Sequence, residues 1–260
     1  MNLGHFDTVN LSVIRPEHRV LFLGLGDSTS VQVAPELRRA FLSFAKTNLR
    51  CFPWREPGTS PYALLIAELL LVQTKASDVA GLWPKLLTRY PTPGQLSRAS
   101  ARSLANLLRP LGLQNQRAKA LRDVARHLDL EHAGQVPTGL VGLLTLPHVG
   151  LYVATAVSCF GHGARVPIVD ANVLRVFSRI FGTPQTEIRR NPTAWATAWA
   201  LLPRRRVALH NYGLLDFAAE ICTPRAPKCA DCHIQEFCLF GGSTISVAVS
   251  LADKQLRRRL

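Results

Sequence analysis

Four cysteines near the end of the chain form the pattern best suited to chemistry. They are spaced Cys222-x6-Cys229-x2-Cys232-x5-Cys238, with prolines and charged residues between them. Thiolates are soft ligands that hold zinc or iron–sulfur clusters. A structural zinc site commonly uses two close ligand pairs separated by a longer loop, whereas this compact set has one close pair. The spacing therefore favours an iron–sulfur cluster, and a chance grouping of core cysteines is the weaker explanation.

A second pattern is the segment Leu146-Pro147-His148-Val149-Gly150-Leu151-Tyr152, which lies between two short predicted helices. A glycine turn before a helix N-terminus presents backbone N–H groups to an anion. This makes His148 and Gly150 candidates for binding a phosphate. Because a glycine turn between helices is also common for purely structural reasons, both interpretations stay open at this point.

Two carboxylates stand at positions where chemistry can use them. Asp170 follows the short apolar run of residues 166–169 and precedes a predicted helix, so it caps that helix, presents a carboxylate at its start, or does both. Glu68 interrupts an apolar helix, where a carboxylate is either a paired structural group or a functional acid.

Charge and composition narrow the class of partner. Lys and Arg number 31 against 17 Asp and Glu, a formal net charge of +14. Such a surplus favours a polyanion as partner, although surface solubilisation alone also explains it. A hydrophobic content of 47 % excludes a chain disordered throughout. With no apolar run of about 18 residues and no secretory signal, we expect no membrane contact and a cytoplasmic location, associated with the nucleoid in a bacterium or archaeon.

The cysteine spacing resembles the [4Fe-4S] loop of the endonuclease III superfamily of DNA glycosylases, and residues 146–152 resemble its helix–hairpin–helix. The resemblance covers about Pro35 to Cys238. It implies a DNA glycosylase of base excision repair that flips a base out of the duplex and hydrolyses its N-glycosidic bond. The implied partner is double-stranded DNA with a mismatched or damaged base, and we expect the protein to act as a monomer.

The resemblance also implies catalytic roles. Asp170 occupies the position of the catalytic aspartate, and Glu68 matches the acid that protonates the base in relatives that remove adenine. Lyase-competent members carry a lysine where this chain has Tyr152. Because a phenol cannot form a Schiff base with the sugar, Tyr152 predicts a monofunctional enzyme.

Further positions match residues that contact DNA in the superfamily. Gln73 matches a residue that enters the duplex near the flipped nucleotide, Leu113 matches a loop wedge, and Gln114 stands where the adenine branch usually has a tyrosine wedge. Ordinary packing at a helix end or loop remains the alternative for each. The superfamily usually has glycine where this chain has His148, so the phosphate grip is either altered or tolerant of a side chain.

Two monofunctional branches fit these residues. The motifs favour the branch that removes thymine or uracil opposite guanine, in part because the short stretch after Cys238 leaves no room for a domain that reads 8-oxoguanine. The alternative is an adenine DNA glycosylase that acts opposite 8-oxoguanine or guanine. A second alternative is a non-catalytic DNA-binding or redox-sensing iron–sulfur protein.

The elements that must position these residues are predicted to be helices throughout. We expect an all-α fold of two helical lobes: a six-helix, barrel-like domain over 61–164 with the helix–hairpin–helix, and an iron–sulfur cluster domain over 33–60 plus 165–240. Residues 1–32 are expected to be an extension and 241–260 a basic tail. The predicted helices run approximately over 37–49, 62–73, 76–89, 101–109, 115–128, 140–144, 150–160, 169–181, 194–202 and 207–221.

Overall fold

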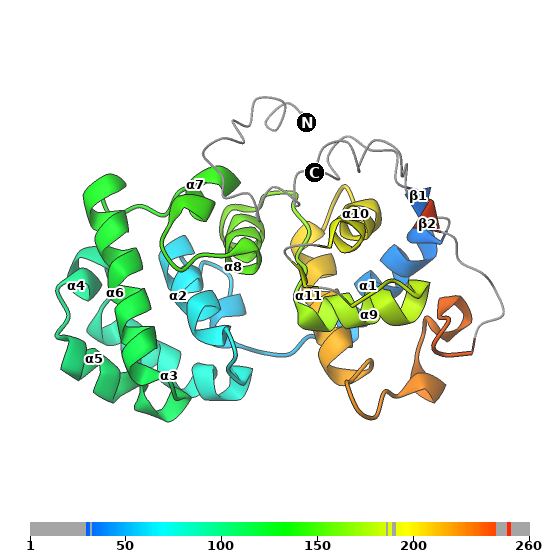
Figure 1. Cartoon of the computed structure of the whole chain (residues 1–260), viewed down its shortest axis with the longest axis horizontal. Coiled ribbons are helices and arrows are strands. Elements are labelled where there is room, and N and C mark those ends of the chain that lie inside the picture. Colours follow the sequence, from blue (N-terminus) through cyan, green and yellow to red (C-terminus); the bar gives the residue numbers. More distant parts are fainter. Residues whose placement is uncertain (1–29, 32, 186, 189–190, 243–248, 251–260) are drawn as a thin grey trace. The chain divides into compact units, whose positions relative to one another are not determined.

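The computed structural model describes residues 30–31, 33–185, 187–188, 191–242 and 249–250. This part of the chain is helical apart from one antiparallel pair of two-residue strands, β1 (Ser30–Val31) and β2 (Val249–Ser250) (Figure 1). The predicted all-α fold is confirmed. Most of the predicted N-terminal extension and basic tail lies outside the described residues.

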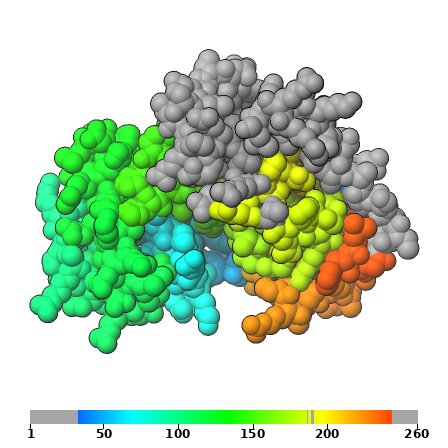
Figure 2. Space-filling model, in the orientation of Figure 1, coloured from blue at the N-terminus to red at the C-terminus, as the bar shows by residue number. Residues whose placement is uncertain are grey.

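The chain divides into two compact units. Residues 51–164 form one, here called the hairpin unit, and the described residues up to 50 together with the described residues from 165 onward form the other, the cysteine unit. Figures 1 and 2 draw the hairpin unit in cyan to green. Our expected boundary lay near residue 60, but the structure assigns residues 51–60 to the hairpin unit. There Trp54 stacks on Phe52 at 4.8 Å and meets the edge of Trp83 at 6.2 Å.

The hairpin unit contains α2 (Pro61–Leu71), whose residues 62–70 are all buried. Ser60 fixes the start of this helix by accepting a hydrogen bond from the Ala63 backbone nitrogen at 3.2 Å. Such a helix, apolar all round, belongs inside a core. The other helical segments of this unit are η3 (Pro53–Arg55), α3 (Ala76–Arg89), α4 (Pro93–Ser97), α5 (Ala101–Leu108), η4 (Arg109–Leu111), α6 (Gln114–Glu131), α7 (Leu140–Thr145), α8 (Leu151–Ala156) and the π-helical turn η5 (Val157–Gly161).

In the cysteine unit, α1 (Ala34–Asn48) packs closely against α11 (Val207–Glu220). Gly213 permits this approach, because a Cβ atom there would collide with the carbonyl oxygen of Phe41. At the end of α1, Asp216 accepts hydrogen bonds from the Arg50 backbone nitrogen at 2.9 Å and from its Nε at 2.7 Å. The remaining elements are α9 (Ala171–Phe181), α10 (Pro192–Leu201) and two 3-10 turns, η7 (Cys229–Asp231) and η8 (Gln235–Phe237).

The observed helices differ from the predicted ones in three informative places. A short helix, α4, was missed, although Thr92 caps it and Pro93 occupies its first turn. The helix predicted over 150–160 ends at Ala156 and continues as the π turn η5. Finally, α10 begins two residues early because Asn191 accepts a hydrogen bond from the Ala194 backbone nitrogen at 2.9 Å. In the described part of the chain, every helix is too short or too polar to cross a membrane.

Candidate functional site

Asp170 is the N-cap of α9, and two donors hold its carboxylate. Oδ1 accepts from the Val173 backbone nitrogen at 2.7 Å, and Oδ2 accepts from Asn172 Nδ2 at 2.8 Å. Arg175 donates from Nη1 to Asn172 Oδ1 at 2.9 Å, which keeps the Asn172 amide group turned toward Asp170. The predicted capping is confirmed. Since Asp170 remains partly exposed, the helix presents an oriented carboxylate at its start.

The other two predicted catalytic residues belong to the hairpin unit. Glu68 lies in the middle of α2 and is only 2 % exposed. Tyr152 is the second residue of α8 and is half-buried. The helices α2 and α8 pack against each other. Glu68 is thus a carboxyl group enclosed in the core of the hairpin unit.

The predicted hairpin joins α7 to α8. The chain turns back after α7, and the Val149 backbone nitrogen donates to the Leu146 carbonyl oxygen at 3.3 Å. Gly150 then begins α8 as its N-cap. The first N–H groups of any helix lack intrahelical acceptors, so this turn offers donors to an anion. The geometry agrees with the predicted hairpin, and a role in binding phosphate stays a prediction.

His148 occupies an unusual position in this turn. Its φ is +60°, in the left-handed region that favours glycine. Its Nε2 lies 2.9 Å from Oδ2 of Asp123 on α6, and Lys119 Nζ donates to the same oxygen at 2.6 Å. Partial burial alone raises the pKa of Asp123, but the hydrogen bonds and charges of Lys119 and His148 outweigh it and hold that pKa below its ordinary value. Asp123 is therefore an ionised partner for His148.

A buried arginine joins the two loops that carry Gln73 and Leu113. Both residues are exposed and have positive φ, +55° for Gln73 and +48° for Leu113. Arg117 on α6 lies between their loops and is 9 % exposed. Its acceptors are the carbonyl oxygens of Gly112, Leu70 and Val72 at 3.0, 3.2 and 3.2 Å and the hydroxyl oxygen of Thr74 at 2.6 Å. The chain thus fixes both loops without a ligand.

These loops share one open cavity with the hairpin. Its volume is about 460 Å³, and Gln73, Leu113, Arg117 and His148 all line it. Gln114 follows Leu113 as the first residue of α6 and is half-buried. The structure therefore brings three of the predicted DNA-contacting residues to one cavity of the hairpin unit.

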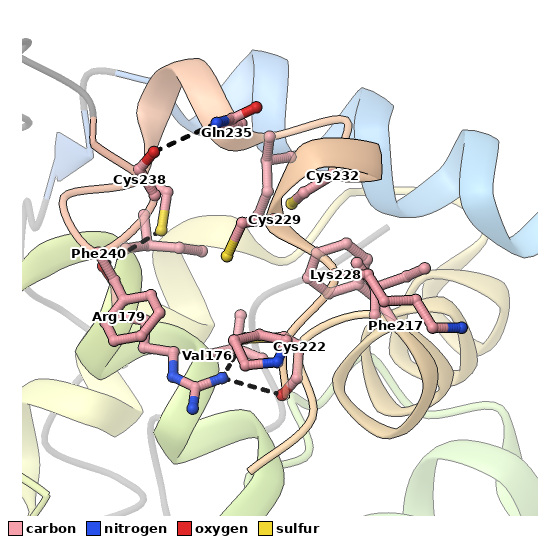
Figure 3. A pocket seen from close by; sticks show the side chains of 15 residues that line it. Val176, Arg179, Phe217, Cys222, Lys228, Cys229, Cys232, Gln235, Cys238 and Phe240 are labelled. Atoms are coloured by element: carbon pink, nitrogen blue, oxygen red, sulfur yellow. Dashed lines mark hydrogen bonds between the residues drawn. The ribbon is translucent and has the colours of Figure 1, made fainter. Parts of the chain in front are cut away.

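The four cysteines at 222, 229, 232 and 238, the cysteine loop, line a single cavity beside α9 (Figure 3). Apolar side chains complete its lining, among them Val176 and Phe217. Arg179 Nη1 lies 3.3 Å from Cys222 Sγ. Burial raises the pKa values of the Cys232 and Cys238 thiols, and negative charge on neighbouring thiols raises them further. Four thiolates around one cavity repel one another unless a bound metal ion or cluster supplies positive charge.

The four residues of the cysteine loop form a donor set of one chemical kind. In the residues that the structure describes, no three His, Cys, Asp or Glu side chains are close enough to hold one metal ion. None of the six cysteines, all of which lie among the described residues, forms a disulfide. Four thiols that line one cavity provide the kind of donor set, cysteine thiolates, by which proteins hold iron–sulfur clusters. The residues present therefore fit an iron–sulfur cluster.

Comparison with known proteins establishes the family. Residues 66–196 match the HhH-GPD superfamily of base excision DNA repair proteins. The chain belongs to this superfamily. As a member of the HhH-GPD superfamily, the protein is a DNA glycosylase, an enzyme that hydrolyses N-glycosyl bonds, and its partner is DNA. The predicted family and enzyme class are confirmed, and DNA binding accounts for the positive surplus of charge.

Relatives from two branches of the HhH-GPD superfamily are similar to this chain. The thymine-DNA glycosylase of Aeropyrum pernix is 35 % identical over 192 residues, which cover 72 % of this chain and 86 % of that protein. The adenine DNA glycosylase of Mycobacterium tuberculosis is 36 % identical over 230 residues, 84 % of this chain and 75 % of that protein. The structure of a thermostable thymine-DNA glycosylase superposes with a TM-score of 0.75 at 34 % identity, covering 81 % of this chain and 99 % of the other.

Sequence reasoning missed the residues that support the site. Arg117 carried a usable signal, since it lies on the apolar stripe of α6 with Leu121, Val124 and Leu128. A charged residue on such a stripe must find buried acceptors. Asp123 carried no comparable signal, because its partner His148 lies 25 positions further along the chain.

Proposed function

We propose that this DNA glycosylase is monofunctional, removes thymine or uracil mispaired with guanine, and leaves an abasic site. Two observations carry the proposal: the carboxylate of Asp170 is oriented at the start of α9, and a tyrosine, Tyr152, stands at the second position of α8. The carboxylate of Asp170 stabilises the positive charge that develops on the sugar and orients the attacking water. Tyr152 lacks the amine that a lyase uses to form a Schiff base, so the reaction ends after hydrolysis.

Recognition of the substrate begins with distortion of the duplex. Gln73 and Leu113, exposed at the tips of loops that Arg117 joins, enter the DNA beside the target nucleotide, and Gln114 follows at the start of α6. The hairpin at His148 and Gly150 binds a backbone phosphate through its N–H groups. A mispaired base costs less to extrude than a paired one, so this distortion itself selects mismatches.

The chemical step is a hydrolysis. As the N-glycosidic bond breaks, its electron pair leaves with the base and positive charge develops on the sugar. Asp170 stabilises that charge and orients the water, whose oxygen bonds to C1′ of the sugar while the water gives up a proton to the Asp170 carboxylate. The departing base takes up a proton, and Glu68 is the acid that we assign to this transfer.

Cys222, Cys229, Cys232 and Cys238 are the residues that we propose hold a [4Fe-4S] cluster. A bound cluster cross-links four thiolates of the loop and supplies one-electron redox chemistry. We assign no step of base removal to it.

The choice of base rests on Gln114 and on the relatives. Gln114 stands at the start of α6, where the adenine branch usually has tyrosine, and the relative from Aeropyrum pernix is a thymine-DNA glycosylase. The second candidate is removal of adenine opposite 8-oxoguanine. The 36 % identity to the Mycobacterium tuberculosis adenine DNA glycosylase, over 84 % of this chain, favours it.

A panel of labelled duplexes tests the proposal. The purified protein is incubated with otherwise identical duplexes that carry T:G, U:G or A opposite 8-oxoguanine, and the target strand is examined with and without hot alkali. We expect breaks at T and U only after alkali, and no covalent complex after borohydride. Excision of adenine alone would favour the second candidate, and breaks without alkali or a borohydride-trapped complex would contradict the monofunctional mechanism.

A further inference from the structure

The turn of the hairpin holds a residue that its backbone conformation does not favour. His148 has a φ of +60°, and a residue with a Cβ atom is disfavoured in this left-handed region relative to glycine by roughly tenfold in population. A contact from outside the turn can therefore stabilise residue 148 in this conformation.

The contact that does so comes from α6. Asp123 Oδ2 lies 2.9 Å from Nε2 of His148, and Lys119 Nζ holds the same carboxylate oxygen at 2.6 Å. Asp123 is 32 % exposed and His148 40 % exposed. The side chain at the turn is thus tied to α6, a helix of the same unit.

The position of Asp123 is otherwise unfavourable for a DNA-binding protein. It lines a groove between α5 and α6 whose other charged residues, within the described part of the chain, are Arg102, Lys119, Arg122 and Arg126. A carboxylate among these cations repels phosphate and weakens the field that attracts DNA. On electrostatic grounds alone, its removal should tighten DNA binding.

We propose that Asp123 is a positioning residue that holds the imidazole of His148 and so keeps the hairpin in its DNA-binding conformation. This inference rests on the proposed phosphate-binding role of the hairpin. Asp123 stabilises His148 in a left-handed backbone conformation that glycine adopts without any side-chain contact. Without Asp123, residue 148 leaves the left-handed region more often, and the apparent affinity for DNA falls with the competent fraction.

A four-protein cycle tests the proposal: wild type, Asp123→Ala, His148→Gly and the double variant. The dissociation constant is measured for a fluorescein-labelled duplex with one G:T pair. We expect Asp123→Ala to weaken binding about three- to tenfold in the wild-type background. With His148→Gly the turn needs no support, so there the same change alters binding by no more than about twofold.

Two further variants separate the positioning role of Asp123 from the effect of its negative charge on DNA binding. Asp129 lies on the same helix, is 33 % exposed and pairs with Arg98, so Asp129→Ala removes an equal charge without touching the hairpin. It should leave binding unchanged or tighten it. Asp123→Asn removes the charge but keeps an amide oxygen that accepts a hydrogen bond, so it should retain most of the affinity that Asp123→Ala loses.

The proposal fails if Asp123→Ala binds DNA as tightly as the wild type or more tightly. It also fails if that change costs the same factor in both backgrounds. Because the cycle measures DNA binding, its result does not depend on which base the enzyme removes. A wild type that excises nothing from the duplex panel while the cycle shows the rescue would refute the proposed function and leave the role of Asp123 intact.

Discussion

The hairpin unit and the cysteine unit both use arginines on a helix to hold a functional loop, but to different extents. In the hairpin unit, one arginine, Arg117, binds both the loop after α2 and the loop before α6. In the cysteine unit, the arginines of α9 bind the start of the cysteine loop: Arg175 donates to the Cys222 carbonyl oxygen at 3.0 Å, and Arg179 to the Thr223 carbonyl oxygen at 2.7 Å.

The middle of the cysteine loop is held differently. The far end is tied to α9 through the Phe240 backbone nitrogen, which donates to the Arg179 carbonyl oxygen at 3.0 Å. Between the two ends, the backbone hydrogen bonds described for residues 229–238 span only three residues each. Short turns of this kind open easily unless something else fixes them. The comparison shows that Arg117 fixes the two loops of the hairpin unit from within the chain, whereas we propose that the middle of the cysteine loop depends on the cluster that we assign to it.

The largest expected effect is loss of a cluster ligand. In Cys232→Ser, we expect the visible absorbance of the cluster to disappear and trypsin to cut at Arg225 and Lys228 within the loop. A ligand at a thousand times its dissociation constant stabilises a fold by about 4 kcal/mol, so the cysteine unit should lose about that much. Cys51→Ser, which removes an exposed thiol outside the loop, is the control. If trypsin cut Cys232→Ser no faster than the wild type, the cysteine loop would not depend on the cluster, and the proposed difference between the two units would be wrong.

Acid should weaken the cysteine unit through His210, which is 1 % exposed on α11. Burial, with help from the charge of Arg38, lowers its pKa from 6.5 to about 4. Between these pH values the unfolded chain binds a proton that the folded chain does not. Stability is therefore complete above about pH 6.5 and falls as the pH drops to about 4, by about 3 kcal/mol in all.

Urea unfolding at pH 7 and pH 4.5 measures this loss, with His210→Gln expected to remove most of the pH dependence. His132→Gln in the hairpin unit serves as the control. Trp195 and Trp199 report on the cysteine unit, and Trp54 and Trp83 report on the hairpin unit. If His210→Gln kept the full pH dependence, the acid sensitivity would have to be assigned elsewhere.

A smaller effect is expected from Arg117→Lys, which keeps the charge but not the planar fork of donors. An ammonium group cannot reach all four acceptors, and two lost hydrogen bonds cost about 2 kcal/mol. Excision should slow along with this loss, because the loops of Gln73 and Leu113 are no longer joined. Arg126→Gln, an exposed change on the same helix, should alter stability by no more than about 0.5 kcal/mol. Equal losses in both variants would contradict the role given to Arg117.

The sequence predicted what depends on local pattern and spacing. The cap at Asp170, the stop at Gly182 and the apolar helix around Glu68 follow from propensity and periodicity, and the structure confirms the cap and the stop. The contacts of Arg117 and Asp123 were not predictable in this way, because their partners lie up to 47 positions away and meet them only in the folded unit. The left-handed conformation of His148 was also not predictable from its residue type, because residues other than glycine seldom adopt positive φ even though histidine is among the types enriched there.

The central claim, that Asp170 drives removal of the base, is tested most directly by single-turnover excision from a G:T duplex by Asp170→Asn. Asparagine caps helices as well as aspartate does, so the variant should fold and bind the duplex as the wild type does. Glu220→Gln, which removes an exposed acid on α11, provides the control. We predict that Asp170→Asn excises thymine at least about a hundredfold more slowly than the wild type. Excision at the wild-type rate would contradict the account.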